Sequence, residues 1–474
     1  MDAAGTEGAT GPARGVGPDG HDDRGAVPDA VVASRRLSRW VLGLIAATLV
    51  LLGATVWLAH RHADAIVARA RTRLDADLAT LAAVPRTRPP LRTPTLPGDA
   101  FDEVDAAVAE LLRPDPALGS ATSFRFPPLG GFAAYLDARR GGLERLRASE
   151  RRAYAAPPPW ALDGPAGPRL HRQDVTDAQS VTHNAAAEYL AAGRADDALR
   201  CALPWIVLGA DEQRSLGFLW VNSGIARSSR ARSVLRDVLA HAQPGAAALA
   251  EAAEVLDGLE AHAPAWADVL LAEQCAIRRT RLELVASPGE RSSSVRAPVG
   301  GARWLWSERL FQAALLEEEL AYDDACLPPL RTPSGGWAAA RRAIEEAGAS
   351  SSDPMASFGT RGTVALVDFA ARLRTDHPLD RVAVALAWYR AERGVLPATL
   401  GDLVPRHLAS VPTCPETGLP LRYDRTRGLV WAPGYDGDDD GGRPRPDVYD
   451  LAVDGDEVRA LFAPRASGEA PEAR

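Results

Sequence analysis

Hydrophobic positions form three patterns along the chain, and the first is an unbroken apolar run. Residues 40–59 carry no charged side chain, and about twenty apolar residues in an α-helix span the hydrocarbon core of a bilayer. Trp40 and Trp57 stand near the two ends, where indole rings favour the membrane interface. Because a signal peptide has only roughly 7–15 apolar residues, we expect an uncleaved transmembrane anchor at 35–62, with cleavage near Ala63 as the alternative.

The second pattern is helical, because apolar residues recur at three- and four-residue spacing from the end of the anchor to residue 375. It predicts a helical stalk and a Pro-rich linker at 63–99, then an α-helical bundle or array at 100–375. Gly193 and Gly209 are expected to end two helices, and a Ser/Gly-rich link is expected at 348–362. The predicted helices cover 101–112, 131–155, 176–192, 195–208, 211–242, 245–262, 265–287, 303–325 and 337–347.

The third pattern, beyond residue 375, combines an amphipathic helix at 377–393 with short alternating segments. Strands are expected at 421–423, 428–432 and 448–453. Together these elements predict a small α+β domain at 376–460. The ends of the chain, 1–34 and 461–474, are expected to be disordered, because they offer little apolar surface to bury. The predicted fold class is therefore mainly α, with one transmembrane helix, an α-helical domain and a small α+β ending.

Net charge and cysteine spacing exclude several classes of function. The net charge is −8 and the pI about 5.7, so a nucleic-acid partner is not expected, because it requires a basic face. All 54 basic residues are arginine. None of the cysteines stands in a C-x-x-C pair, which excludes a zinc ribbon and a thioredoxin motif. We expect them to be small buried hydrophobes, with disulfides left open if the body lies outside the cytoplasm. These cysteines are Cys201, Cys275, Cys326 and Cys414.

One acidic stretch has the spacing of a metal site. Asp436, Asp438 and Asp440 form the pattern D-x-D-x-D-G, and Asp447 stands at position twelve. Calcium prefers about six to eight oxygen ligands, and the carbonyl of Gly442 would add one. We therefore expect these five residues to hold Ca²⁺, in a β context rather than an EF-hand. The alternative is a solvated acidic loop balanced by four arginines, which are Arg425, Arg427, Arg443 and Arg445.

Three short motifs order the C-terminal segment: G-x-x-P at 394–397, L-x-x-L-V-P at 400–405 and P-x-x-P-x-T-G at 412–418. With the acidic loop that follows, residues 376–455 resemble the globular end of the major pseudopilin of type II secretion, which carries a calcium-binding loop there. No prepilin cleavage motif precedes Trp40, so the chain is not a pseudopilin proper. It is similar to membrane-anchored bacterial proteins, notably from planctomycetes, that join a helical middle to this ending. That likeness implies an architecture and no activity.

The sequence offers no familiar catalytic motif: it lacks a P-loop, G-x-G-x-x-G, G-x-S-x-G and H-E-x-x-H. His183 is expected to be a packed or surface residue. Glu273 is expected to pair with Arg278 or Arg279, and the acidic residues 317–319 are expected to form a solvated helix face. An enzyme is therefore the less favoured class.

These observations favour a non-enzymatic, membrane-anchored envelope protein whose partners are the lipid bilayer and an unidentified envelope protein. Arginines flank both ends of the apolar run, so the positive-inside rule does not set the orientation. A weak calcium loop would be empty in the cytosol, which favours a periplasmic or extracellular body on the cytoplasmic membrane. Two alternatives stay open: an accessory component of a type II secretion or type IV pilus-like system, and an envelope hydrolase using Glu273 or the 317–319 carboxylates with a histidine.

Overall fold

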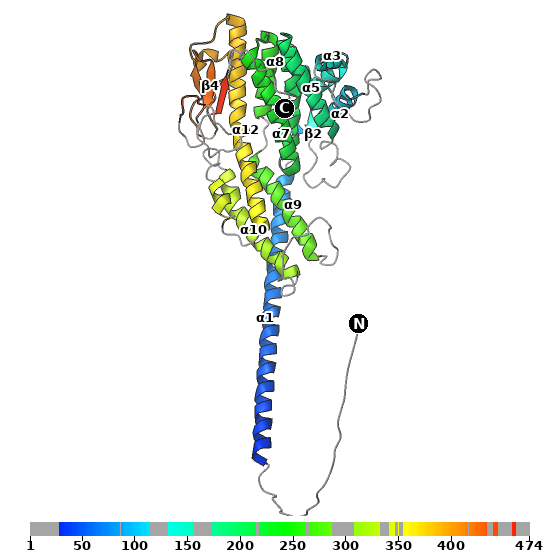
Figure 1. Ribbon diagram of the computed structural model, residues 1–474, viewed down its shortest axis with the longest axis vertical. Coiled ribbons are helices and arrows are strands. Elements are labelled where there is room, and N and C mark those ends of the chain that lie inside the picture. The colour runs from blue at the N-terminus through cyan, green and yellow to red at the C-terminus, as the bar shows by residue number, and fades with distance from the viewer. Residues whose placement is uncertain are drawn as a thin grey trace, which may run out of the picture. The chain divides into compact units, whose positions relative to one another are not determined.

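The computed structural model is mainly helical, and its described residues contain two small β-sheets (Figure 1). The described residues are 28–85, 87–113, 131–155, 173–214, 218–261, 265–286, 308–331, 341–346, 349, 354–415, 417–433, 439–443 and 457–460. The chain divides into two compact units, Met1–His62 and Ala63–Arg474. The expectation of a mainly α fold is confirmed.

The first unit contains the N-terminal part of helix α1 (Pro28–Ala82), which exposes large apolar side chains between Trp40 and Leu58, such as Leu44, which is 70% exposed. The hydroxyls of Thr48 and Thr55 donate to the carbonyls of Leu44 and Leu51, each at 2.8 Å. These polar groups are therefore satisfied inside the helix, as a lipid environment requires. The helix is long and apolar enough to cross a membrane.

Residues 63–82 of α1 belong to the second unit, where they are packed on one face. Their buried side chains share a cluster with α9 (Trp266–Ala286) and α10 (Glu308–Leu330). These side chains keep helical spacing and are Ala63, Ile66, Val67, Ala70, Leu74 and Leu81. The predicted stalk is thus helical, and its apolar stripe is covered by other helices of the same unit.

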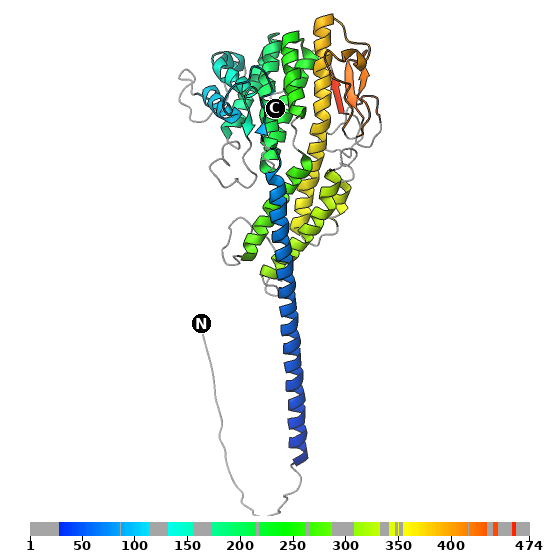
Figure 2. The ribbon, with the colours of Figure 1, turned by 180° about the vertical axis from the view of Figure 1, so that it is seen from behind.

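The other helices of the second unit agree with most of the predicted ranges. They are α2 (Ala100–Leu111), α3 (Phe132–Asp137), α4 (Arg140–Ser149), α5 (Gln173–Ala191), α6 (Ala195–Gln213), α7 (Phe218–His241), α8 (Ala246–Ala261) and α12 (Pro354–Arg393). Helix α6 packs against α5 and α7, and α8 packs against α12 (Figure 2). The single helix expected at 131–155 is instead α3, α4 and the strand β2 (Tyr154–Ala155), which pairs with β1 (Thr87–Arg88).

Gly209 does not end a helix, which corrects the prediction. It lies inside α6, where a Cβ would come within 2.6 Å of the carbonyl oxygen of Gly224 on α7. The two glycines face each other, so the backbones of α6 and α7 approach more closely than any side chain allows. Gly193, by contrast, has φ of +74° between α5 and α6 and makes the expected turn.

The C-terminal segment shares its core with the helical body. Buried residues of α12, such as Leu379 and Leu386, belong to one cluster with α2, α5, α6 and α8, and Leu403 and Val430 belong to the same cluster. The domain boundary expected at 375/376 lies inside α12, which begins at Pro354 and so also occupies part of the link expected at 348–362. A link read from Ser and Gly content is therefore helical over much of its length.

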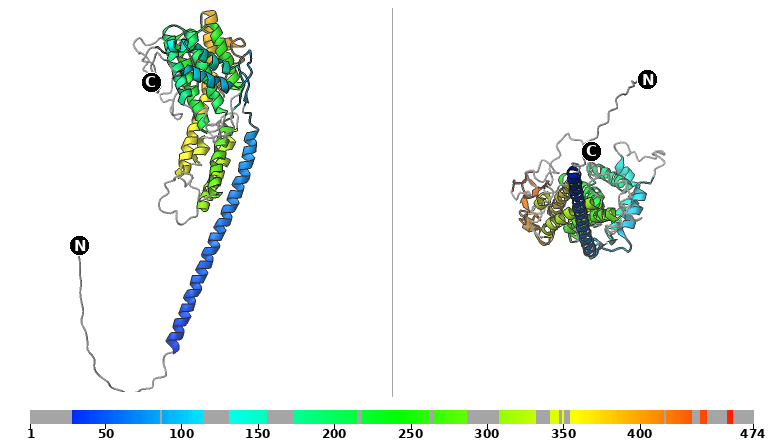
Figure 3. Two further views of the ribbon diagram at one scale, coloured as in Figure 1. Left: turned by 90° about the vertical axis from the view of Figure 1, so that its right-hand side faces the viewer. Right: turned by 90° about the horizontal axis from the view of Figure 1, so that it is seen from below.

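A three-stranded antiparallel sheet, in the order β3-β4-β5, closes the described chain. It consists of β3 (Arg422–Asp424), β4 (Leu429–Ala432) and β5 (Glu457–Ala460). The first two strands confirm the predictions at 421–423 and 428–432, while the range 448–453 lies outside the described residues. The sheet lies on one side of α12, and α2–α4 lie beyond α6–α8 on the opposite side of this unit (Figure 3).

Candidate functional site

The predicted calcium loop is described only in part. Asp440 is half-buried and Gly442 is buried, whereas Asp436, Asp438 and Asp447 lie outside the described residues. Within the described residues, no group of three or more His, Cys, Asp or Glu side chains is placed to hold a metal ion. Calcium binding at this loop therefore stays a prediction.

Asp439, a carboxylate outside the predicted ligand set, organises the described part of this loop. It accepts hydrogen bonds from Trp431 Nε1 at 2.9 Å and from the Gly441 amide at 3.1 Å, and it pairs with Arg422 at 3.1 Å. The bond from Trp431, the other donors and the nearby arginine lower the pKa of Asp439. Arg422 and Trp431 are register partners on β3 and β4, so the sheet itself presents both groups to Asp439.

Arg427 binds the carbonyl of Gly442, which the sequence predicts as a calcium ligand, and also the carbonyl of Gly441. Its guanidinium donates to the carbonyl oxygens of Gly441 at 2.7 Å and Gly442 at 3.2 Å. These bonds supply part of the balancing positive charge that the alternative, a solvated acidic loop, requires. A calcium ion that used the Gly442 carbonyl would have to share it with a cationic side chain.

His183 is half-buried on α5, between its two expected placements. Burial, together with Arg230 and Arg227, lowers the pKa of His183 to about 3. The imidazole is therefore neutral at physiological pH. A half-buried histidine that stays neutral is typical of a packing residue.

The acidic cluster of α10 is not a uniformly solvated face, which corrects the prediction. Glu317 is exposed and pairs with Arg69 of α1 at 3.2 Å. Glu319 and Asp323 are buried and contact the fully buried guanidinium of Arg278, with a distance of 3.3 Å for Glu319. Helical periodicity alone does not predict the burial of Glu319 and Asp323, because it places charged residues on the solvent-facing side of a helix.

Arg278 has carboxylates of α1 and α10 around it, and the pairing of Glu273 with Arg278 or Arg279 stays a prediction. Besides Glu319 and Asp323, Arg278 bonds Asp77 of α1 at 2.7 Å, and Arg279 bonds Glu283 at 3.0 Å. Burial raises the pKa of Glu319 to about 8 and that of Asp323 to about 7, against the lowering effect of Arg278. This buried cluster ties α1, α9 and α10 together.

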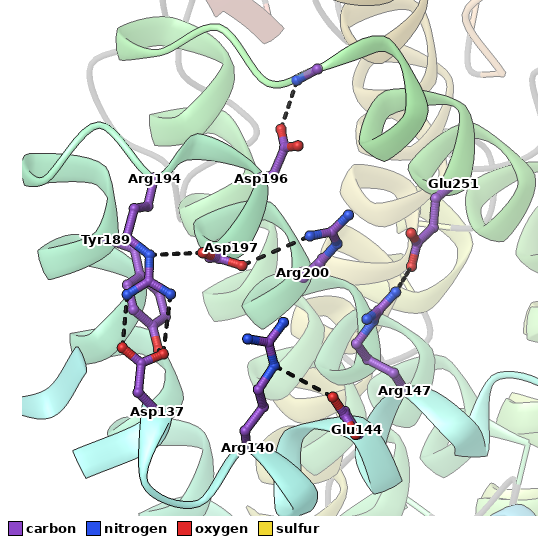
Figure 4. Close-up of polar contacts among 11 residues, drawn as sticks. Asp137, Arg140, Glu144, Arg147, Tyr189, Arg194, Asp196, Asp197, Arg200 and Glu251 are labelled. Atoms are coloured by element: carbon purple, nitrogen blue, oxygen red, sulfur yellow. Dashed lines mark hydrogen bonds and ion pairs between the residues drawn. The ribbon is translucent and has the colours of Figure 1, made fainter. Parts of the chain in front are cut away.

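A small pocket lies between α3, α4, α5 and α6 (Figure 4). Its position depends on Glu188 of α5, whose carboxylate accepts the amides of Gly131, Phe132 and Ala133 at 2.9, 3.0 and 2.8 Å. These bonds satisfy the orphan N–H groups at the start of α3. Asp137, at the other end of this short helix, is thereby fixed at the pocket wall.

One half of this pocket is a closed ion-pair network around Arg194. Its guanidinium bonds both oxygens of Asp137 at 2.7 and 3.1 Å, and its Nε bonds Asp197 at 2.8 Å. It also stacks on the ring of Tyr189 at 4.2 Å, and the Tyr189 hydroxyl donates to Asp137 at 2.9 Å. These contacts lower the pKa of Asp137, first through Arg194. These contacts in this half of the pocket hold α3, α5 and α6 together.

The other half of the pocket is lined by three further arginines, Arg140, Arg147 and Arg200. Arg140 pairs with Glu144 at 3.4 Å, and Arg147 pairs with Glu251 of α8. Sequence reasoning missed this pocket, because its arginines lie on helices that meet only in the folded chain. The one available signal was the exclusive use of arginine, the side chain best suited to fixed carboxylate pairing.

The chain matches no protein-family model, no curated protein and no solved structure in the comparisons made. The likeness of residues 376–455 to a pseudopilin therefore stays a prediction from the sequence motifs.

Proposed function

We propose that this protein is a membrane-anchored envelope protein without catalytic activity, whose α-helical body presents an interaction surface. The observation that carries the proposal is α1, which joins an exposed apolar span to a packed segment within one helix. The span would lie in the cytoplasmic membrane, with the body on its periplasmic or extracellular side. The C-terminal sheet and its acidic loop would form a module stabilised by Ca²⁺.

The buried ion pairs support a binding rather than a catalytic role for the helical body. Of the carboxylates that the hydrolase alternative names, Glu317 is paired with Arg69 and Glu319 is buried against Arg278. His183 is neutral at physiological pH. The described pocket is small and lined by ion pairs, so it suits recognition of a small polar group.

The test is covalent capture in native membranes. The full chain is expressed with an affinity tag, cross-linked in cells and purified beside a control that keeps residues 1–62 and lacks the body. We expect one protein to be enriched with the full chain and not with the control. If the two purifications recover the same proteins in the same amounts, the body is not an interaction surface.

A second candidate function is an accessory role in a type II secretion or type IV pilus-like system. The order of elements in the C-terminal segment favours it, because α12, the short helix at Leu400–Leu403, β3 and β4 follow one another as the pseudopilin likeness requires. Deleting the gene should then reduce secretion or pilus assembly, and unchanged secretion would exclude this role.

A further inference from the structure

The three arginines on the open side of the pocket have hydrogen-bonding capacity to spare. Arg200 approaches Asp197 only at 3.8 Å, and its side chain is 29% exposed. Arg140 and Glu144 form a loose, exposed pair at 3.4 Å. An exposed pair of this kind contributes little stability and exchanges readily for another partner.

The balance of charge in the pocket also favours an anion. Its lining contains four arginines and three carboxylates. Two of these carboxylates, Asp137 and Asp197, are bound at short distance by Arg194. The remaining arginines, Arg140, Arg147 and Arg200, surround the same space from α4 and α6 (Figure 4). Arg140 and Arg147 each have a carboxylate partner, Glu144 and Glu251, so the lining has one more arginine than it has carboxylates.

The dimensions limit the ligand to one small group. The volume of the pocket is about 20 Å³, which is room for one or two water molecules. Leu136 and Leu143 line it beside the arginines, so a carbon adjacent to the anionic group would meet an apolar wall. The planar fork of arginine matches the oxygens of phosphate and carboxylate and binds them through charge-assisted hydrogen bonds.

We propose that this pocket binds a single oxyanion group, a phosphate or a carboxylate, carried by a larger ligand that enters from solvent. Arg200 and Arg140 bind the oxygens, and Arg147 adds positive charge while it stays paired with Glu251. Arg194 binds no ligand and holds the wall of the pocket. This inference rests on the proposed interaction role of the helical body and gives that role a ligand class.

The test is calorimetric titration of the detergent-solubilised full chain, at constant ionic strength, with inorganic phosphate, a phosphate monoester and acetate in separate arms. We expect saturable binding that is weakened about tenfold by R200Q and by R140Q, the loss of one charge-assisted hydrogen bond each. The matched control is R341Q, which removes an arginine paired with Glu345 outside the pocket and should bind as the wild type does.

Stronger binding of the phosphates would assign the pocket to phosphate-bearing ligands, and stronger binding of acetate would assign it to carboxylates. No saturable binding in any arm, or equal weakening by R341Q, would overturn the proposal. Thermal unfolding of each variant without ligand verifies that it is folded. If titration fails while covalent capture still recovers a partner, the pocket proposal falls and the interaction role stands.

Discussion

Arginine residues buried against carboxylates define the interior of this protein at the residue scale. Arg88 is fully buried and bonds both oxygens of Asp211 at 2.6 and 2.8 Å. Arg227 and Glu212 form a second buried pair at 3.0 Å, and Arg278 lies among three carboxylates. Guanidinium stays charged when buried and fits a carboxylate with two parallel bonds, which lysine does not. The absence of lysine from the sequence is therefore consistent with the structure, although the sequence could not say which arginines are buried.

Above about pH 7, stability should fall as the pH rises, because several buried carboxyl groups bind protons more tightly in the folded state. The pKa of Glu319 rises from 4.5 to about 8 through burial, and burial raises the pKa values of Glu150 and Glu212 to about 7. Each group stays protonated in the folded chain after it has ionised in the unfolded chain. Their contribution is full below about pH 4.5 and is lost as the pH passes about 7 to 8.

The measurement is the urea midpoint of the solubilised full chain from about pH 7 to about pH 9, because at lower pH the neutral His183 and His377 make stability rise with pH. Glu319→Gln mimics the protonated side chain and should flatten the decline. Glu317→Gln changes an exposed neighbour on the same helix and should leave the slope unchanged. A midpoint that rises over this range would show that these carboxyl groups are ionised in the folded chain.

The acidic loop gives a second prediction at this scale. The full chain should bind Ca²⁺ with a dissociation constant on the order of 10⁻⁴–10⁻³ M, because the predicted ligand set is that of a weak extracellular site. Asp440→Asn and Asp438→Asn should each abolish saturation in calorimetry. Glu283→Gln, a change at an exposed ion pair far along the chain, serves as the control. If both loop variants still bind Ca²⁺ saturably, the loop is not the calcium site and is a solvated acidic turn.

At the scale of elements, the sequence predicted helices well and their crossings poorly. The ranges expected at 245–262 and 265–287 differ by only a residue or so at either end from α8 and α9, because apolar periodicity reports which residues face inward. Periodicity does not report which helix lies opposite. The sequence therefore predicts a helix end at Gly209, whereas this residue marks the point where α6 meets α7.

The crossing of α6 and α7 should be intolerant of a single methyl group. Gly224→Ala would place its Cβ against the backbone carbonyl of Gly209 and should lower the free energy of unfolding by about 1–3 kcal/mol, the usual cost of overpacking. Gly401→Ala is the matched control, since its Cβ would meet only the Thr399 hydroxyl, at 3.4 Å. Equal stability of the two variants in urea would contradict the close approach.

At the scale of the whole molecule, the second unit has a core that crosses the domain boundary expected from sequence. The composition change near residue 375 is real, yet Leu379 and Leu386 of α12 and Val430 of β4 lie in one cluster with the helices α2–α8. Packing between residues so far apart in the chain cannot be recognised from a short stretch of sequence. The pocket between α3 and α6 was hidden for the same reason, because its arginines converge only through tertiary contacts.

The helical body and the C-terminal segment should accordingly unfold together. Cys201 of α6 and Cys414 near the sheet are both buried free thiols. Their labelling across a urea series, followed by mass spectrometry of each cysteine, should give one shared midpoint, as a cooperative unit requires. Labelling of Cys414 well before Cys201 would show that the C-terminal segment is an independent domain.

The central claim is that residues 40–59 hold this protein in a membrane, and extraction of membranes with alkaline carbonate tests it most directly. The full chain should stay with the lipid, and Leu49→Arg with Leu51→Arg should release it, because each arginine costs about 2.5–3.5 kcal/mol at the centre of a spanning helix. Protease added outside the cytoplasmic membrane should then cleave the body of the retained protein. Full release of the unchanged chain by carbonate would contradict the account.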